Sequence, residues 1–262
     1  MPTQPSHEAR QIAESFGADA DRYDRARPRY PDALIARIAR TAPGPDVLDV
    51  GTGTGIAARQ LREAGCIVHG VEVDARMAAL ARRYGIETDV AGFETWDSAG
   101  RTFDAVVAAQ TWHWIDPSAG AAKAASVLRP GGLLALFWNV WDPDPDLAEA
   151  FGAVYREVLP DLPFKPWARP SGRDPWRLFF EPAEAGLRGS GAFGPVDHWF
   201  YEWQRTYTRD EWLDQVPTSG GHTTLPQPQL DALLAGIGAA VDAVGGSFVL
   251  RYTAVALVSD RQ

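Results

Sequence analysis

The nine residues Val47-Leu48-Asp49-Val50-Gly51-Thr52-Gly53-Thr54-Gly55 join a short apolar run to three alternating glycines. The apolar run predicts a buried parallel strand. The glycines predict a tight turn in which a ligand can approach the backbone closely. Residues 56–62 predict a helix whose N-terminal amides face the same ligand. Strand, turn and helix together indicate the first unit of a nucleotide-binding α/β sheet.

The glycine pattern alone does not decide which nucleotide the loop binds. A dinucleotide fingerprint needs G-x-G-x-x-G/A. Counted from Gly51, its sixth position falls on Ile56, where a small residue is required. Counted from Gly53, it falls on Ala58, which is allowed. A dinucleotide therefore stays possible on spacing alone.

Residues 67–74 predict the second strand, which ends in acidic residues. Glu72 lies 21 positions after Gly51, close to the distance of about 20 expected for a ribose-binding carboxylate. Val73 is assigned to the same site. Asp74 is placed to cap the helix that follows. Met77, in that helix, is either a core residue or a contact for adenine.

Further strands and helices alternate along the rest of the chain. Strands are expected at residues 88–94, 102–110, 133–139, 199–208 and 247–258. Helices are expected at residues 31–39, 118–128, 146–158, 210–216 and 230–244. The fold class is therefore a Rossmann-like α/β domain over residues 1–262, with seven strands and helices on both faces.

Composition narrows the classes of protein. The net charge of −9 argues against a general nucleic-acid binder. The one cysteine, Cys66, excludes an internal disulfide, and no metal-ligand set stands out. No apolar run approaches the ~20 residues of a membrane span, and the N-terminus lacks the order of a signal peptide. A cytoplasmic protein without a membrane partner is expected; the oligomeric state stays unknown.

The stretch V-L-D-V-G-T-G-T-G resembles motif I of the class I S-adenosylmethionine-dependent methyltransferases. The resemblance implies that a loop made of Gly51, Thr52, Gly53 and Gly55 wraps the methionine part of S-adenosylmethionine, with S-adenosylhomocysteine as product. Asp49 would lie near the ammonium group of the cofactor, and Glu72 near its ribose. Phe93, after the third strand, would flank the adenine. The run L-R-P-G-G-x-L at 128–134 is similar to the segment after the motifs of this family, in which the last strand is antiparallel.

Residues 15–31 interleave charges and aromatic residues, in a pattern that resembles the N-terminal segment of the type 11 methyltransferase subgroup. There, this segment can close over the cofactor, so residues 1–30 are interpreted as an arm. Tyr23 is expected as a wall over the sulfonium, and Arg27 as partner of the methionine carboxylate. The alternative is a surface arm held by Phe16 and Tyr30.

The end of the fourth strand places polar and aromatic residues where open α/β sheets bind ligands. The segment from Gln110 to Asp116 resembles the Q-x-x-H-W-x-D segment of the same subgroup. Gln110 is a candidate hydrogen-bonding residue for cofactor or substrate. His113 is either a general base or a packing residue. Trp112 and Trp114 are candidate substrate contacts.

Residues 140–200 are rich in proline and aromatic residues and are expected to form a substrate lid or pocket. Trp138 and Trp141 are assigned to its wall. Beyond the helix at 146–158, this insertion is expected to be irregular up to the sixth strand. The alternative is that its aromatic residues fill a small core. His198 and His222 are weaker candidates for a base.

The implied reaction is attack by an acceptor atom on the methyl group of the cofactor, with a small, apolar or aromatic molecule as acceptor. Positioning supplies much of the catalysis in such a transfer. Two rivals remain: an NAD(P)-dependent oxidoreductase, and a regulator that binds S-adenosylmethionine without catalysis. A nucleic-acid methyltransferase is disfavoured because Gln110-Thr111-Trp112-His113 stands where an Asn/Asp-Pro-Pro-Tyr motif is expected.

Overall fold

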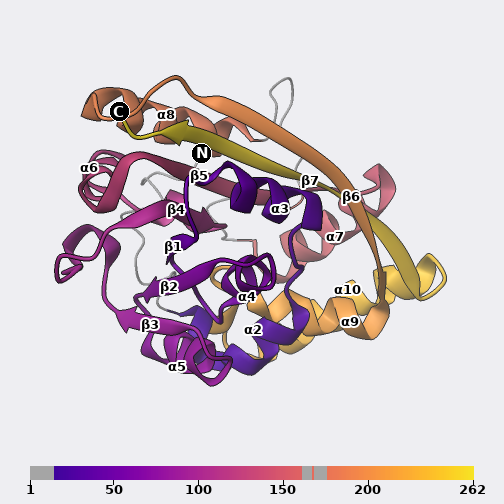
Figure 1. Cartoon of the computed structure of the whole chain (residues 1–262). Coiled ribbons are helices and arrows are strands. Elements are labelled where there is room, and N and C mark those ends of the chain that lie inside the picture. Colours follow the sequence, from indigo (N-terminus) through magenta and orange to yellow (C-terminus); the bar gives the residue numbers. More distant parts are fainter. Residues whose placement is uncertain (1–14, 161–166, 168–175) are drawn as a thin grey trace.

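One seven-stranded sheet runs through the computed structural model, which describes residues 15–160, 167 and 176–262 (Figure 1). The strand order is β3-β2-β1-β4-β5-β7-β6. The first five strands are parallel, and β7 is antiparallel to both β5 and β6. The predicted mixed sheet with an antiparallel last strand is confirmed. The strands are β1 (Asp46–Val50), β2 (Ile67–Glu72), β3 (Glu87–Val90), β4 (Phe103–Ala109), β5 (Leu128–Asp142), β6 (Asp197–Thr208) and β7 (Ser247–Asp260).

Helices pack on both faces of this sheet, because neighbouring residues of a strand point to opposite faces. Val47 packs with α3 and α4 on one face, and Leu48 packs with α6 and α8 on the other. All these side chains are buried, which supplies the main hydrophobic stabilisation of the fold. The helices are α2 (Ala20–Ala26), α3 (Asp32–Thr41), α4 (Ile56–Glu63), α5 (Ala75–Arg83), α6 (Pro117–Val127), α7 (Pro145–Val158), α8 (Arg177–Ser190), α9 (Arg209–Gln215) and α10 (Gln227–Ala243).

A separate hydrophobic core lies at one end of the long strands β6 and β7. At this end the two strands reach α9 and α10 (Figure 1). This core joins α7, α9 and α10 to the far ends of these strands. Phe151, Trp212 and Ile237 are fully buried at its centre. We call this unit the helical core. Its aromatic residues confirm that part of the aromatic excess fills a small core of its own.

The expectation of an irregular segment between the helix at 146–158 and the sixth strand is wrong for residues 177–190, which form α8. Its sequence contains Pro182 and two glycines, Gly186 and Gly189, which disfavour helix. Tertiary packing overrides this preference, because Phe180, Ala183 and Leu187 are buried against the sheet. A Cβ at Gly186 would lie 2.2 Å from the carbonyl oxygen of Pro117, so this glycine permits close packing on α6. Residues 161–166 and 168–175 of the predicted insertion lie outside the described residues.

Candidate functional site

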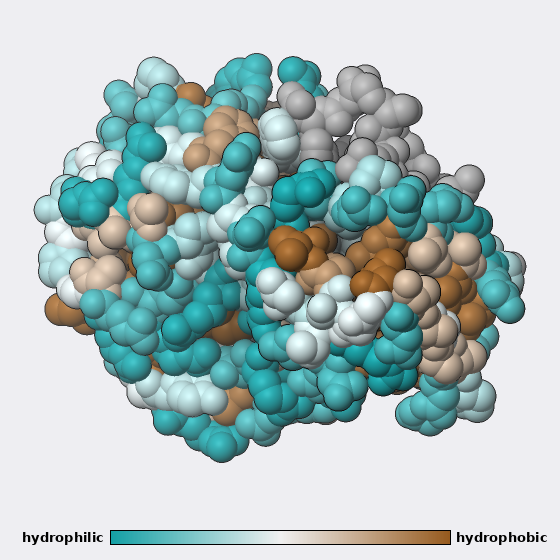
Figure 2. Space-filling model, turned by 90° about the vertical axis from the view of Figure 1, so that its right-hand side faces the viewer, coloured by the Kyte–Doolittle hydropathy of each residue, from teal (hydrophilic) through white to brown (hydrophobic). Residues whose placement is uncertain are grey.

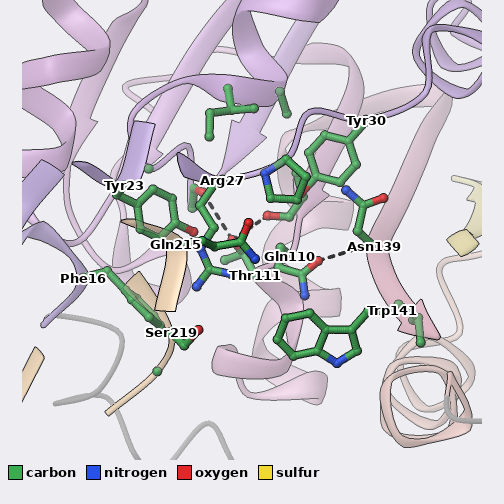
Figure 3. Close-up of a pocket in the computed structure, with 18 of the residues that line it drawn as sticks. Phe16, Tyr23, Arg27, Tyr30, Gln110, Thr111, Asn139, Trp141, Gln215 and Ser219 are labelled. Carbon is green, nitrogen blue, oxygen red and sulfur yellow. Dashed lines mark hydrogen bonds between the residues drawn. The ribbon is translucent and has the colours of Figure 1, made fainter. Parts of the chain in front are cut away.

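Two adjoining cavities open at the carboxyl ends of β1, β4 and β5, where a parallel sheet changes direction and binds ligands. The larger has a volume of about 540 Å³ and the smaller about 100 Å³. Figure 3 shows part of the lining of the larger cavity. The residues that line both are Phe16, Tyr23, Gly51, Gly53, Gln110, Thr111 and Trp114. The two cavities therefore form one continuous site.

The glycine loop borders both cavities and is held by the second strand. Gly51, Gly53 and Gly55 have positive φ angles of 65°, 57° and 88°, a region that favours glycine. The carboxylate of Glu72 accepts hydrogen bonds from the backbone N–H of Gly53 at 2.8 Å and of Asp74 at 2.9 Å. A Cβ built on Gly53 meets its nearest neighbour, Met77, only at 3.7 Å, so this side of the loop faces open space.

The smaller cavity is a largely apolar slot that two carboxylates, Glu72 and Glu94, also line. Val71, Val73, Met77, Phe93 and Ile115 contribute the apolar lining, and Glu72 is the carboxylate that also binds the glycine loop. The structure thus brings the predicted residues of the second strand, its following helix and the Gly92-Phe93 turn to one place. Asp74 caps α5 as predicted, with its side chain accepting from the N–H of Arg76.

Asp49 lies beneath the glycine loop and is fully buried. Among the described residues, neither of its carboxylate oxygens has a hydrogen-bond partner. Burial, with the added charge of Glu72, raises the pKa of Asp49 to about 7. An ionised carboxylate without a partner is costly inside a protein. Asp49 lines neither cavity, so its negative charge acts on a cation in the site from beneath the glycine loop.

The N-terminal arm is hydrogen-bonded to the glycine loop and to the helices α4 and α5 that follow the first two strands. Asp24 accepts hydrogen bonds from Thr54 and Arg59, both at 2.7 Å. The backbone N–H of Gly17 donates to Asp74 at 3.0 Å. Tyr23 lines both cavities and Arg27 lines the larger one.

Phe16 and Tyr30 also anchor the arm, as the alternative interpretation expected, and the Phe16 ring lies 6.2 Å from Trp114, edge to face. The Tyr30 ring lies 4.8 Å from Phe137, edge to face. The guanidinium of Arg27 donates to the carbonyl of Thr218 at 2.5 Å, and its Nε is buried with no partner among the described residues. Arg27 thus keeps one free donor in the site. The arm is both packed on the domain and part of the cavity.

Gln110 directs an amide group into the site from the end of β4. It has a φ of 57°, unusual for a residue other than glycine. Its side-chain oxygen accepts from the backbone N–H of Asn139 at 2.9 Å, and its amide nitrogen points toward Trp141 (Figure 3). Gln110 therefore offers a hydrogen-bond donor to a ligand.

His113 lines the larger cavity in a defined tautomer. The indole N–H of Trp138 donates to its Nδ1 at 3.2 Å. An indole nitrogen only donates, so Nδ1 carries the lone pair and Nε2 the proton. Burial lowers the pKa of His113 to about 4, which keeps the ring neutral at pH 7. This geometry supports a hydrogen-bond donor to the ligand rather than the general base that was considered.

The four tryptophans assigned to substrate fall into two groups. Trp114 and Trp141 line the larger cavity. Trp112 and Trp138 are almost fully buried and line neither cavity, so their assignment as substrate contacts is corrected. Trp112 packs against Phe93 with ring centroids 6.2 Å apart, and Trp138 supports His113. Alternating residues of β5 explain the difference between Trp138 and Trp141, which fall on opposite faces.

The far wall of the larger cavity comes mostly from segments that the sequence did not point to. The residues of this wall are Tyr155, Trp167, Trp212, Gln215, Val216, Ser219, Gly220, His222 and Tyr252. Seven of them lie outside the predicted insertion at 140–200. Figure 2 views the molecule from the side of α7 and α10 and shows hydrophobic residues gathered around a hollow. Of these seven, only His222 was a candidate from the sequence, as a weak candidate for a base, whereas Tyr155 and Trp167 belong to the predicted aromatic insertion.

Comparison with known proteins places the chain beside methyltransferases. A family model described as a methyltransferase domain matches residues 23–244. An uncharacterized methyltransferase of Mycobacterium tuberculosis is 37% identical over 142 residues, covering 51% of this chain and 55% of that protein. A malonyl-[acyl-carrier protein] O-methyltransferase of Enterobacter lignolyticus is 32% identical over 160 residues, covering 57% and 62%. The chain thus matches about half the length of these curated relatives.

Solved structures share the fold. A proposed type II methyltransferase from Anaeromyxobacter dehalogenans aligns with a TM-score of 0.59 at 23% identity, covering 90% of this chain and 97% of that one. The [4+2]-cyclase SpnF aligns with a TM-score of 0.54 at 16% identity, covering 100% and 98%. In the part of the chain that the structure describes, no helix combines the length and apolar character that crossing a membrane requires.

Proposed function

This chain belongs to the class I S-adenosylmethionine-dependent methyltransferases, and we propose that it methylates a small apolar or aromatic molecule. One observation carries the proposal. The glycine loop borders one side of the 540 Å³ cavity, and an aromatic wall closes another. This volume falls within the range of about 300–1,000 Å³ typical of small-molecule sites.

The residues present fit the cofactor of the family. The apolar slot between Met77 and Phe93 suits an adenine ring, and Glu72 suits the ribose hydroxyls because each carboxylate oxygen retains a lone pair. Asp49 supplies the negative charge for an ammonium group. Arg27 supplies the positive charge and the free donor for a carboxylate.

The chemistry needs little beyond alignment. When bound, the cofactor supplies a methyl group activated by a sulfonium. The chain positions the acceptor through the aromatic wall and through the donors of Gln110 and His113, and the N-terminal arm excludes water. Holding the reactants in line lowers the entropic part of the barrier.

Calorimetric titration with S-adenosylhomocysteine and, separately, NADH tests the cofactor. We expect S-adenosylhomocysteine to bind and NADH not to. Glu72→Gln places an amide N–H₂ group against the N–H of Gly53, so binding of S-adenosylhomocysteine should weaken by about 1–3 kcal/mol. Glu87→Gln, an exposed substitution on the neighbouring strand, is the matched control and should leave binding unchanged.

The rivals give different outcomes. Tight binding of NADH would mean that the glycine loop is a dinucleotide turn and that the chain is an oxidoreductase. Binding of S-adenosylhomocysteine with no methyl transfer to any of a panel of phenols, amines and thiols would favour the non-catalytic regulator.

A further inference from the structure

Tyr155 and His222 form a hydrogen-bonded pair in the far wall of the larger cavity. Tyr155 lies on α7 and His222 begins the short 3₁₀ turn His222–Thr224. The Tyr155 hydroxyl lies 2.8 Å from Nε2 of His222. Nδ1 of His222 lies 3.1 Å from the carbonyl oxygen of Ser219. Both side chains are buried, and both line the cavity that also contains the glycine loop.

These two contacts fix the tautomer of His222. A carbonyl oxygen only accepts, so Nδ1 carries the proton and Nε2 carries the lone pair. The Tyr155 hydroxyl therefore donates to Nε2. His113, in the same cavity, has the opposite tautomer because Trp138 occupies its Nδ1. One histidine thus presents a donor to the cavity, and the other presents an acceptor through Tyr155.

Two further features of this wall point to a ligand with a polar hydrogen and a flat apolar body. Gln215 is 1% exposed and lines the cavity, and its side-chain oxygen has no partner among the described residues. Trp141 and Trp167, with ring centroids 4.9 Å apart, line the same cavity. An aromatic ring stacks well on such surfaces, and a hydroxyl satisfies an unpaired acceptor.

We propose that Tyr155 and His222 are a proton relay for a phenolic acceptor, an inference that rests on the proposed methyltransferase function. A new bond joins the phenol oxygen to the methyl carbon. The bond between that carbon and sulfur breaks, and its electron pair goes to sulfur. The phenol proton passes to the oxygen of Tyr155 as the proton of Tyr155 passes to Nε2 of His222. Water takes the extra proton from His222 after the product leaves.

The surroundings of the pair suit a relay in which the proton leaves Tyr155 as another arrives. Burial raises the pKa of Tyr155 far above its usual range, which disfavours a free tyrosinate. Burial also lowers the pKa of His222, while its hydrogen bond to Ser219 raises it, so the ring starts neutral. The guanidinium of Arg27 is the nearby cation that further lowers this pKa and favours an anionic acceptor.

The test uses 4-nitrophenol, which absorbs visible light strongly as the phenolate. Its apparent pKa when bound is measured without cofactor by absorbance, for the wild type, Tyr155→Phe and His222→Gln. A relay predicts that both variants raise this pKa by about one unit or more relative to the wild type. Tyr201→Phe is the matched control, because Tyr201 packs against the hydrophobic core on one face of the sheet and does not line the cavity. It should match the wild type.

The comparison of the two variants separates a relay from a simple hydrogen bond. His222→Gln keeps the hydroxyl of Tyr155, so it behaves like the wild type if Tyr155 only donates a hydrogen bond. Arg27 is present in every variant and cannot produce a difference between them. With a phenolic acceptor and cofactor, each variant should lower kcat about 10²-fold with little change in KM. Thermal unfolding of each variant checks that the fold is retained.

Equal ionisation of bound 4-nitrophenol in the wild type and both variants would overturn the relay, as would a wild type that does not bind it. Failure of S-adenosylhomocysteine to bind is a separate result. It would refute the proposed function while leaving the absorbance result to stand by itself.

Discussion

Replacing Asp49 by Asn should make the free protein more stable at alkaline pH. The carboxylate of Asp49 is fully buried and has no hydrogen-bond partner among the described residues. Its pKa in the folded chain is about 7, against the ordinary value of 3.8. Between these values the folded state binds a proton that the unfolded state has lost, so stability falls as pH rises. Asn has nearly the same shape and never ionises.

The magnitude follows from the two pKa values. Each pKa unit corresponds to about 1.4 kcal/mol, so the raised pKa of Asp49 lowers the stability of the folded state by about 2 kcal/mol at pH 5.5 and about 4 kcal/mol at pH 8. Asp49→Asn should recover these amounts as upper limits. The substitution should also weaken the binding of S-adenosylhomocysteine, because the ammonium group of this ligand loses its counter-charge. Stability and cofactor binding therefore move in opposite directions.

Urea unfolding followed by tryptophan fluorescence, at pH 5.5 and pH 8, measures the gain. Asp89→Asn is a control that should change the free energy of unfolding in the opposite direction. Partial burial raises the pKa of Asp89, but hydrogen bonds from Trp96 and Arg101 lower it to about 2, so its removal should destabilise the protein at both pH values. An equal gain for Asp49→Asn at both pH values, or a loss at pH 8, would refute the account of Asp49.

Two further substitutions test the backbone of the site and the fold. Gly53→Ala adds a methyl group to the open side of the loop at a φ of 57°. Calorimetry should show that the affinity for S-adenosylhomocysteine falls at least tenfold. The melting temperature should fall by only a few degrees, because the backbone strain is about 1 kcal/mol. Gly186→Ala drives a Cβ into Pro117. Urea unfolding should show that the free energy of unfolding falls by about 1–3 kcal/mol, while the affinity for S-adenosylhomocysteine stays unchanged. An unchanged free energy of unfolding would contradict the packing of α8 on α6.

The half of the site around the glycine loop was largely visible in the sequence. Gly51, Gly53 and Gly55 are informative because their backbone angles are ones that other residues avoid. Glu72 is informative because parallel strands of fixed length bring the end of β2 beside the loop. In such local units, spacing along the chain translates directly into distance in space.

The other half depends on contacts between distant segments, which no local pattern encodes. Tyr155 and His222 are 67 residues apart and meet only because the fold brings α7 beside the turn that carries His222. The tautomer of His113 likewise depends on Trp138, 25 residues away. Pro182 argued against a helix where packing on the sheet enforces one. Sequence reasoning failed where tertiary contacts decide the outcome.

The separation of the helical core from the cores that flank the sheet makes the site modular. The glycine loop and Glu72 are anchored to the parallel strands, whereas the far wall is anchored to α7, α9 and α10. Substitutions that reshape the helical core therefore change which acceptor fits, without disturbing the strands that hold the glycine loop and Glu72. For directed evolution of a new specificity, this is the region to randomise, with the parallel strands held constant as the scaffold.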